Sequence, residues 1–592
     1  MFGDGPLSLS EVTKRYRQLN INVSNPTRTV VRIALLSNFT IRGMAEALTV
    51  AFNEHGIVAD VWTCPYAQQE QYVYDAKSEL YTREPQVIIV LNDIEKWFGL
   101  HEVLTETLTF RDALQTRSEI ISNQLHALLQ TLLSRSKANV YWSGFDWYEN
   151  GMNGMLADQK GVSLLTQMIT KMNADIVGAF GSERQFYYFD FPAFAREIGQ
   201  QQLYDLRLRQ LADLCISPEW FYALGHAFVR SMYPLIKSPS KCIVLDLDHT
   251  IWGGVLGEDG FEGIRMGQRG DGWAFWMFQH GLKLLKSRGF LLSIVSRNEL
   301  ADVEHVLRAH SDAVLKYEDF VAIRCNWERK SGNIRSIADE LNIGLDALIF
   351  FDDDPVNRAE VRSAVPEVIV PELSLEPLEY HQLLRKLPSL QVYEITEEDS
   401  KRTQMYLEQR KRSDAKSSFE SLDAYLQSLK LEVLIDTWQQ GDLKRLEQLF
   451  QRTNQFNTTH IRLTQQQLLE YRERSDVWCR IVRINDRFGD HGDSGAVIVY
   501  KVADQWVIEM FLLSCRVLGR GIEDAVIATV AKNAASAGAR KIIVKYTEHP
   551  KNTPVKQWLA ASPFLPTQDG YAFDLVKEYP YKMFIQIKES LG

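Results

Sequence analysis

The chain has 592 residues, and at about 150 residues per domain this length predicts three to four domains. Hydrophobic residues make up 45% and charged residues 24%, which excludes collagen-like, coiled-coil and wholly disordered chains. The 66 Lys and Arg residues against 76 Asp and Glu residues give a net charge of -10, so the strongly basic composition of many nucleic-acid-binding domains is absent.

The first third of the chain alternates apolar strands with helical segments. From Val30, VVRIALLS predicts a buried strand, GMAEALTVAFNEHG an amphipathic helix and IVADVW a second strand. Two further apolar runs, Val87–Leu91 and Ala174–Phe180, are expected to continue this sheet as strands between helices. The segment Lys237–Lys241, KSPSK, has the Ser and Pro content of a linker and predicts a domain boundary. This gives an α/β domain over residues 1–236.

A second α/β domain is expected over residues 237–394. Its predicted strands are CIVLDL, FLLSIV, ALIFF and EVIV, and they are so continuously apolar that both of their faces should be buried, as in a parallel sheet. The segment that follows, from Ile395 to Ser418, is highly charged and is typical of a solvated helix. A connecting helix is therefore assigned to residues 395–425.

The last part of the chain, residues 426–592, has a mixed α+β pattern. The helix DLKRLEQLFQRT precedes three predicted strands, VWCRIVRI, GAVIVYK and WVIEMFLLS. A helix from Gly521 and a further strand, KIIVK, complete the pattern. The sequence therefore predicts a multidomain α/β protein with three domains.

The most informative motif is VLDLDHTIWGG, which places Asp246 and Asp248 at the end of a buried strand. Residues two apart on a strand share one face, so both carboxylates can address one ligand beyond the carboxyl end of the sheet. Such a pair alone is also compatible with an ordinary acidic strand end. The neighbouring strands favour function, because FLLSIV leads into Ser296, ALIFF leads into Asp352 and its two acidic neighbours, and Lys330 lies between them.

These residue types suit phosphoryl transfer. Asp246 would be the nucleophile, and Asp248 would act as general acid and base and offer its backbone carbonyl to a metal ion. A Mg²⁺ ion held by Asp246, Asp248 and Asp352 would offset the repulsion between an anionic nucleophile and a phosphate. Ser296 and Lys330 would hold the phosphoryl oxygens. The crowding of the acidic triplet itself favours a bound cation.

Through these four ordered motifs the middle domain resembles the haloacid dehalogenase (HAD)-like phosphatases. More narrowly, DLDHTIWGGVLGEDG, VSRNE, NWERKSGNI and FFDDDPVNRAEV resemble the FkbH-like group, subfamily IIIC of that superfamily. The resemblance implies an enzyme that loads a glyceryl unit from 1,3-bisphosphoglycerate onto the phosphopantetheine thiol of an acyl carrier protein for polyketide-type biosynthesis. Three residues depart from the expected pattern, His249, Arg297 and Asp354, but none of these changes removes a proposed chemical group.

The spacing of the motifs leaves no room for a separate cap domain. Only 47 residues separate Asp248 from Ser296, and 21 separate Lys330 from Asp352. Water must then be excluded by the flap around Trp252–Gly260, by a neighbouring domain or by a macromolecular substrate. An open, capless site suits the arm of a carrier protein.

A second candidate site lies in FLLSCRVLGRGIEDAVIATVA, where Arg516, Gly519 and Gly521 stand between a predicted strand and a predicted helix. Small residues let backbone N–H groups approach phosphates at a helix N-terminus. The pattern resembles the pyrophosphate loop of GNAT-type acyltransferases, although an ordinary tight turn has a similar signature. Pantetheine or acyl binding is assigned to these residues and to Asn552, for which a turn-forming role is the alternative.

Cys515 directly precedes this loop, where Arg516 and the helix beginning near Gly521 are expected to lower its thiol pKa. Its thiolate can take an acyl group from an acyl phosphate and pass it to pantetheine; the alternative is an inert strand cysteine. Cys242 is a competing thiol, but it lies four residues, about 13 Å, from the strand end at Asp246.

Two polar loops, NQFNTTHIRL and DRFGDHGDSGAV, also resemble FkbH-like sequence and are expected to line the acyl site. The residues concerned are Asn454, Asn457, Arg487 and Asp490. Ordinary turn chemistry explains each of them equally well.

The first domain offers a weaker signal. SNFT places Ser37 where an SGNH-type hydrolase carries its nucleophile, and His226 lies near the end of the domain. Neither a GDS block nor a D-x-x-H pair is present, and a Ser-His-Asp hydrolase needs both partners within hydrogen-bond reach. This SGNH-like domain is therefore predicted to be non-catalytic and to serve in docking or shielding.

Two alternatives to the glyceryl transferase stay open. One is a small-molecule phosphomonoesterase fused to an N-acyltransferase, and the other is a non-catalytic scaffold that binds a carrier protein. The six cysteines form no CxxC pair, the N-terminal segment lacks a signal-peptide pattern, and no stretch approaches 18 apolar residues. A cytoplasmic protein that binds neither membrane nor nucleic acid is expected.

Overall fold

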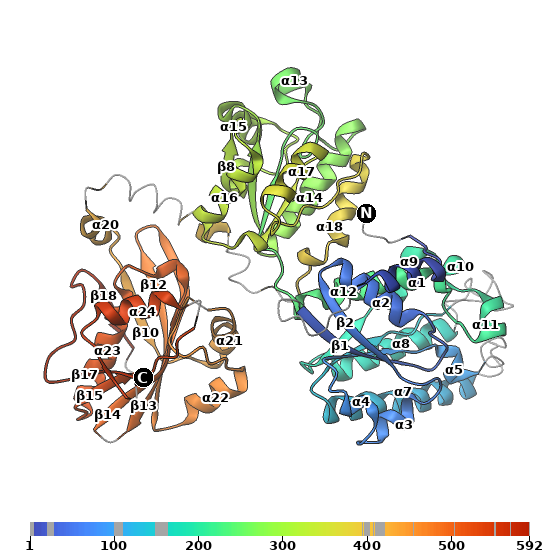
Figure 1. Cartoon of the computed structure of the whole chain (residues 1–592), viewed down its shortest axis with the longest axis horizontal. Coiled ribbons are helices and arrows are strands. Elements are labelled where there is room, and N and C mark those ends of the chain that lie inside the picture. Colours follow the sequence, from blue (N-terminus) through green and yellow to red (C-terminus); the bar gives the residue numbers. More distant parts are fainter. Residues whose placement is uncertain are drawn as a thin grey trace.

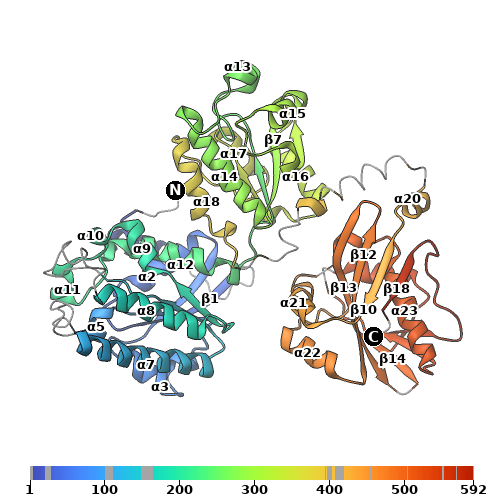
Figure 2. The ribbon, with the colours of Figure 1, turned by 180° about the vertical axis from the view of Figure 1, so that it is seen from behind.

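The computed structural model describes residues 5–19, 29–99, 111–147, 164–393, 395, 403–406, 408, 419, 421–453, 455–502, 504–549, 552–568 and 570–590. Figure 1 shows three lobes in chain order, each built around its own β-sheet, and Figure 2 shows them from behind. The first two sheets are parallel throughout, and the third is mostly antiparallel, so the chain is a mixed α/β protein.

The first sheet has the strand order β2-β1-β3-β4-β5. Its strands are β1 (Thr29–Ser37), β2 (Ile57–Thr63), β3 (Val87–Leu91), β4 (Asn139–Ser143) and β5 (Phe186–Phe189). The helices that share a core with one face are α1 (Leu9–Gln18), α2 (Met44–Glu54), α9 (Phe191–Ile198), α10 (Gln200–Leu203) and α12 (Phe221–Ile236). Those on the opposite face are α3 (Gln69–Tyr74), α4 (Glu79–Thr82), α5 (Ile94–Phe98), α7 (Arg111–Arg135) and α8 (Leu164–Phe180). Because both faces are covered, the strands are continuously apolar.

The predicted strand at Ala174–Phe180 is wrong, because these residues form the end of α8. The buried residues Met172, Ile176 and Phe180 recur at four-residue intervals, which is the spacing of one helix face. The fifth strand of the sheet is β5, which follows that helix.

The second sheet has the strand order β8-β7-β6-β9. Its strands are β6 (Cys242–Leu245), β7 (Leu291–Ser296), β8 (Phe320–Cys325) and β9 (Leu348–Phe351). The helices on one face are α14 (Trp273–Ser287), α15 (Leu300–Ala309) and α18 (Tyr380–Lys386). Those on the other face are α16 (Lys330–Leu341) and α17 (Pro355–Ala364). The flap after β6 contains α13 (Leu256–Gly263).

One of the four strands predicted for this sheet does not form. EVIV makes only an isolated bridge, between Ile349 and Ile369. The missing fourth strand is β8, FVAIRC, which pairs with β7 and whose first residues are buried. The parallel architecture is therefore as expected, but one outer strand was assigned to the wrong segment.

The third sheet runs β16-β17-β15-β14-β13-β12-β10-β18, with β11 paired to β14. Its strands are β10 (Glu432–Asp436), β11 (Phe456–Asn457), β12 (Val477–Asp486), β13 (Gly489–Val502), β14 (Gln505–Leu513), β15 (Lys541–Val544), β16 (Leu565–Thr567), β17 (Gly570–Asp574) and β18 (Gln586–Glu589). The helices that share a core with one face are α20 (Leu422–Ser428), α23 (Ile522–Ser536) and α24 (Thr553–Ala561). Those on the other face are α21 (Leu443–Arg452) and α22 (Gln465–Glu473).

The predicted connecting helix at residues 395–425 lies mostly outside the described residues. Residues 403–406 are helical, and α20 begins at Leu422. Among the helices that the structure describes, none combines the length and apolarity that crossing a membrane requires.

The first two lobes meet at α12 and the chain that follows α18. The Tyr393 hydroxyl donates to the Ser231 carbonyl and is also hydrogen-bonded to the Tyr141 hydroxyl. The backbone N–H of Ser240 donates to the Ser389 carbonyl at 2.9 Å. These contacts join the last segment of the second lobe to the first sheet.

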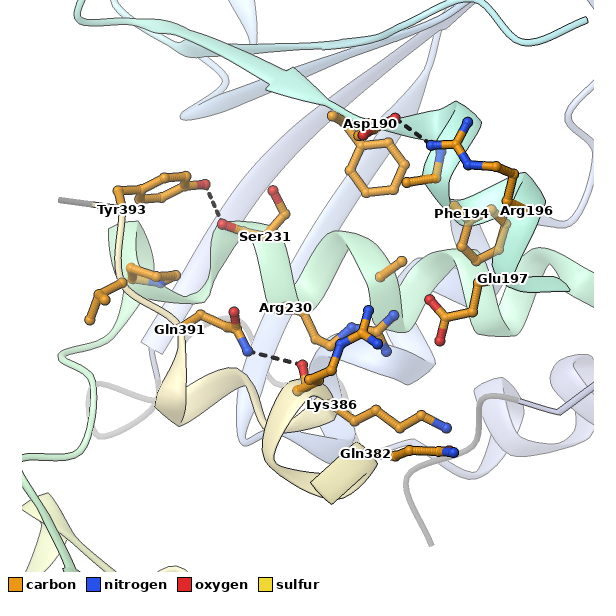
Figure 3. A pocket seen from close by; sticks show the side chains of 16 residues that line it. Asp190, Phe194, Arg196, Glu197, Arg230, Ser231, Gln382, Lys386, Gln391 and Tyr393 are labelled. Atoms are coloured by element: carbon orange, nitrogen blue, oxygen red, sulfur yellow. Dashed lines mark hydrogen bonds between the residues drawn. The ribbon is translucent and has the colours of Figure 1, made fainter. Parts of the chain in front are cut away.

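A cavity of about 970 Å³ lies at this junction, between α9, α12 and α18 (Figure 3). Its lining carries cationic side chains from both lobes, among them Arg196, Arg230 and Lys386, together with the acidic Asp190 and Glu197. Among the predicted catalytic and ligand-binding residues whose side chains the structure describes, none lines it.

Candidate active site

Asp246, Lys330 and Asp352 meet at the carboxyl end of the second sheet. Asp246 directly follows β6, and Asp352 directly follows the adjacent strand β9. Lys330 is the first residue of α16, and its Nζ lies 2.7 Å from Asp246 Oδ1 and 3.3 Å from Asp352 Oδ2. The same ammonium group donates to the Val295 carbonyl at 2.8 Å. All three charged side chains are buried, which strengthens the electrostatic interactions between them.

A third carboxylate, that of Asp353, joins this pocket. Carboxylate oxygens of Asp246, Asp352 and Asp353 lie within 4.8 Å of one another, and two of these three carboxyl groups, those of Asp246 and Asp352, pair with the ammonium of Lys330. Within the described part of the chain, the buried oxygens Asp246 Oδ1 and Asp352 Oδ2 accept no hydrogen bond and are balanced only by the ion pairs with Lys330. Closely spaced carboxylate oxygens with an excess of negative charge fit a hard divalent cation such as Mg²⁺.

Two of these carboxyl groups have raised pKa values. Burial, and after it repulsion from Asp246, raises the pKa of Asp352 to about 6. The same two causes raise the pKa of Asp353, while His249 acts in the opposite direction. A cation between the carboxylates would favour their ionised forms, so the electrostatics agree with the geometry.

The loop after β9 is held in shape by two residues that the strand-end pattern does not reveal. Asp352 Oδ1 accepts hydrogen bonds from Asp354 N at 2.9 Å and from Asn357 Nδ2 at 3.2 Å. Arg358 Nη1 donates to the backbone carbonyls of Asp352, at 2.8 Å, and Asp353, at 2.6 Å. Asn357 and Arg358 are positioning residues, and their only sequence signal is their place in FFDDDPVNRAEV.

The carboxylate of Asp248 is engaged by the flap and is not part of the acidic cluster. Its Oδ1 accepts hydrogen bonds from Trp252 Nε1 at 2.9 Å and from Leu256 N at 3.0 Å. Its Oδ2 accepts one from Asn298 Nδ2 at 2.9 Å. These donors orient the carboxylate at the base of the flap, and Oδ2, which accepts a single hydrogen bond from the described residues, keeps a lone pair for proton transfer. The metal contact expected through its backbone carbonyl stays a prediction.

Ser296 is the last residue of β7 and is buried beside the pocket. Its hydroxyl accepts a hydrogen bond from Asn298 Nδ2 at 3.1 Å. Asn298 thus links Ser296, a predicted phosphate ligand, to the predicted acid and base Asp248. Sequence reasoning missed Asn298 as a site residue, although it lies within VSRNE. The phosphate contacts of Ser296 and Lys330 themselves stay predictions.

His249 follows Asp248 with a strained backbone. Its φ angle of 53° lies in the left-handed region that residues other than glycine rarely adopt. The Tyr380 hydroxyl donates to the His249 carbonyl at 3.4 Å, which helps to hold this turn. His249 also opposes the rise in the pKa of Asp353, so the presence of histidine at this position of the motif affects the charge of the pocket.

The predicted pantetheine loop connects β14 to α23. Gly519 and Gly521 have φ angles of 74° and 82°, which glycine adopts without strain, and Gly521 is the N-cap of α23. The Gly519 N–H donates to Glu523 Oε1 at 2.9 Å, and burial raises the pKa of this carboxyl group. The Gly519 N–H, which the sequence assigns to phosphate binding, is therefore already hydrogen-bonded to the acidic side chain of Glu523 in the following helix.

Of the two candidate thiols, the structure describes the surroundings of Cys242. The side chain of Cys515 lies outside the described part of the structure, as does Asn454, so their roles stay predictions. Cys242 is fully buried, with its Sγ 3.3 Å from Ser293 Oγ. Burial raises the pKa of Cys242 to about 12, which makes it an unsuitable nucleophile near neutral pH.

Asn552 is a buried support of its loop. Its Oδ1 accepts hydrogen bonds from His549 N at 3.1 Å and from the Tyr546 hydroxyl at 3.3 Å. Its Nδ2 donates to the carbonyls of Asn457 at 3.3 Å and Thr547 at 2.9 Å. Both donors and both acceptor positions of the amide are in use, so this conformation has no capacity left for pantetheine.

The other predicted acyl-site residues also have local contacts. The Asn457 Oδ1 accepts a hydrogen bond from His460 N at 2.9 Å. The Arg487 guanidinium lies 4.5 Å from the centre of the Phe488 ring, and Asp490 shapes a turn by accepting from a backbone N–H two residues on. These contacts agree with the turn chemistry that the sequence left as the alternative.

A buried ionic cluster that sequence reasoning missed supports the loop. His491 Nε2 lies 2.9 Å from Asp486 Oδ2 and 3.1 Å from Arg520 Nη1. Arg520 Nη2 also donates to the Arg516 carbonyl at 2.8 Å. The cluster ties the β12–β13 hairpin to the residues that lead into α23.

Ser37 and His226 lie near opposite ends of β1. Ser37 ends β1, and its hydroxyl donates to the Phe39 carbonyl at 3.0 Å. His226 instead contacts the end of α2, with Nε2 3.1 Å from Glu54 Oε2 and Nδ1 3.3 Å from His55 Nε2. Because α2 ends where the next strand begins, about the length of β1 separates Ser37 from His226. The two do not form a Ser-His pair.

Comparisons with known proteins agree with parts of this description. Residues 32–227 match the family model described as FkbH, N-terminal domain. The solved N-terminal part of a Bacteroides fragilis protein, which contains a phosphatase domain complexed with Mg, is 26% identical and covers 66% of this chain and 99% of that chain, with a TM-score of 0.56.

Two acetyltransferase structures are also similar to part of the chain. The PaiA N-acetyltransferase of Thermoplasma acidophilum in complex with coenzyme A is 13% identical and covers 25% of this chain and 99% of that chain, with a TM-score of 0.20. A spermidine/spermine N-acetyltransferase of Vibrio cholerae is 11% identical and covers 25% of this chain and 95% of that chain, with a TM-score of 0.19. No curated protein matches the chain. The FkbH match and the phosphatase-domain neighbour together support a phosphatase-related enzyme.

Proposed function

We propose that this chain is a Mg²⁺-dependent phosphatase and acyl transferase. It moves a glyceryl unit from 1,3-bisphosphoglycerate to the pantetheine thiol of an acyl carrier protein and removes phosphate. The observation that carries the proposal is the buried pocket formed by Asp246, Asp352 and Lys330. The Mg in the similar phosphatase domain from Bacteroides fragilis supports the choice of cation. The FkbH match and the FkbH-like motifs of the middle domain support the carrier-bound substrate.

Asp246 is the nucleophile of the phosphatase half. Its carboxylate attacks the phosphorus of a phosphomonoester, the bond from phosphorus to the leaving oxygen breaks, and Asp248 gives that oxygen a proton. Asp248 then takes a proton from water, which hydrolyses the aspartyl phosphate to inorganic phosphate and free Asp246. Lys330 and Ser296 hold the phosphoryl oxygens. When bound to Asp246, Asp352 and the Asp248 carbonyl, Mg²⁺ supplies neutralisation of the phosphate charge.

The acyl phosphate of the donor reacts at its carbon atom. The Cys515 thiolate attacks the acyl carbon, the carbon–oxygen bond to phosphate breaks, and inorganic phosphate leaves with the electron pair. The deprotonated pantetheine thiol of the carrier then attacks the resulting thioester, so the acyl group passes to the carrier and the Cys515 thiolate is restored. This division of labour leaves the aspartates free to cleave the remaining phosphomonoester.

Intact-protein mass spectrometry tests the proposal. Incubation with 1,3-bisphosphoglycerate, Mg²⁺ and a holo acyl carrier protein should add a glyceryl unit to the carrier and release phosphate. The wild-type chain should carry an acyl adduct that Cys515→Ala lacks, and a Cys515→Ala variant that loads the carrier at the normal rate would rule out this thiol. Steady phosphate release without a change in carrier mass would favour the phosphomonoesterase, and no change in donor or carrier would favour the scaffold.

A further inference from the structure

Four exposed apolar side chains lie at the end of the second sheet that holds the acidic pocket. Each of the four strand-to-helix connections at the carboxyl edge of the second sheet carries one of them, at or near the start of its helix. They are Trp273 (43% exposed), Leu300 (44%), Trp327 (66%) and Val356 (71%), here called the apolar rim. Several large apolar residues exposed at one end of a sheet indicate an interaction surface, whereas single exposed ones need no explanation.

The rim stands next to the pocket on both of its sides. Trp327 precedes Lys330 by three residues, and Val356 follows Asp353 by three. The strand order β8-β7-β6-β9 places the connections that carry Trp327 and Leu300 on one side of Asp246 and the connection that carries Val356 on the other. Three strand spacings separate the two outer connections, roughly 14 Å. A small phosphorylated metabolite bound at Asp246 occupies the middle of this span, whereas a folded protein is large enough to cover all of it.

The size of the rim favours a transient partner over a second copy of the chain. With roughly 150–250 Å² for each fully exposed aromatic side chain, the rim offers about 300–400 Å² of accessible apolar surface. That is a patch of the size that is often functional on monomers, and about half of one side of a standard interface. Stable homodimers bury larger and more apolar surfaces.

A protein bound to the apolar rim would also exclude water from the acidic pocket. The pocket holds buried charges whose interactions weaken when water enters, and the lengths of the segments between the motifs exclude a cap domain. We propose that the apolar rim is the docking surface for the acyl carrier protein, which covers the pocket while its pantetheine arm delivers the phosphorylated glyceryl unit. This inference rests on the proposed function, because the carrier is the partner named there.

The chain offers a matched control for the test. Leu284 is 57% exposed on α14, close to the end of that helix that lies away from the pocket. Leu284→Ala therefore removes the same atoms as Leu300→Ala from a somewhat more exposed place in the same domain. Trp327→Ala removes the largest rim side chain, and tryptophan residues dominate the binding energy of many interfaces.

Two measurements on the full chain decide the inference. The first is the Kd for each holo acyl carrier protein encoded in the source genome. The second is the ratio of kcat/KM for the carrier-bound substrate to kcat/KM for para-nitrophenyl phosphate. Trp327→Ala should raise Kd and lower the ratio by about tenfold, Leu300→Ala should do so by about threefold, and Leu284→Ala should change neither.

Several results would overturn the docking surface. They are an unchanged Kd in Trp327→Ala, a parallel loss of both activities, the absence of carrier binding by the wild-type chain, or a wild-type dimer that Trp327→Ala dissociates. Carrier binding that depends on the rim but leads to no transfer would contradict the proposed function and support the docking surface. If Trp327→Ala transfers the glyceryl unit as well as the wild type does, the docking surface is contradicted and the proposed function is supported.

Discussion

Replacing Asp352 with asparagine removes one buried negative charge from the pocket and keeps its shape. The amide oxygen of the new side chain can still accept the hydrogen bonds that Asp354 N and Asn357 Nδ2 now donate to Asp352 Oδ1. Burial and repulsion from Asp246 raise the pKa of Asp352 from 3.8 to about 6. At 1.36 kcal/mol per pKa unit, the ionised carboxylate then destabilises the folded chain by roughly 3 kcal/mol.

The sign of this effect fixes its pH dependence. A carboxyl group whose pKa is higher in the folded than in the unfolded chain adds stability below pH 4, and that contribution is lost as the pH rises through about 6. In cation-free buffer Asp352→Asn should therefore match the wild type near pH 4 and exceed it by roughly 3 kcal/mol at pH 8. For a domain of 150–250 residues this corresponds to an increase in Tm of about 6–12 °C.

Thermal unfolding in the presence of a chelator measures this difference, with Asp339→Asn as the control because Asp339 is exposed on the same domain. With saturating Mg²⁺ the wild type should become more stable than Asp352→Asn, since ligand binding stabilises only the chain that retains the metal site. A variant that is no more stable than the wild type at pH 8, or whose advantage is independent of pH, would refute the electrostatic account of the pocket.

Three further predictions concern single side chains. Asp246→Asn should keep the fold by circular dichroism and lose phosphate release by at least a hundredfold, and undiminished release would contradict its role as nucleophile. Asn298→Ala should lower kcat by roughly ten- to a hundredfold with little change in KM, because it removes a donor that orients the Asp248 carboxylate; a change in KM alone would point to substrate binding instead. Glu523→Ala should tighten the binding of phosphopantetheine about tenfold by calorimetry, because it frees the Gly519 amide and removes a carboxylate; equal affinities in both proteins would show that this carboxylate does not govern the loop.

The pocket could be predicted because its residues follow apolar strands. A continuous apolar run identifies β6 and β9, and the parallel arrangement brings their carboxyl ends to one edge, so Asp246 and Asp352 had to lie close together. Lys330 does not directly follow a predicted strand, and only its place in the order of the motifs indicates that it belongs to the site. Its contact with both carboxylates depends on how α16 packs, which the local sequence does not encode.

The features that could not be predicted depend on tertiary contacts. Ala174–Phe180 and EVIV are short apolar runs whose sequence fits a strand as well as a buried helix or loop, and packing decides between them. Asn298 is an ordinary polar residue until the fold brings it to Asp248. The bond from Gly519 to Glu523 likewise appears only once the loop is built, although the loop and helix themselves were expected.

The central claim is that Asp246 forms a bond to phosphorus, and one measurement addresses it directly. Acid quenching during turnover of para-nitrophenyl phosphate with Mg²⁺, followed by peptide mass spectrometry, should find a phosphoryl group on Asp246. The same adduct should be absent from Asp246→Asn. Rapid phosphate release with the adduct on another residue, such as Asp248 or Asp352, would contradict the account.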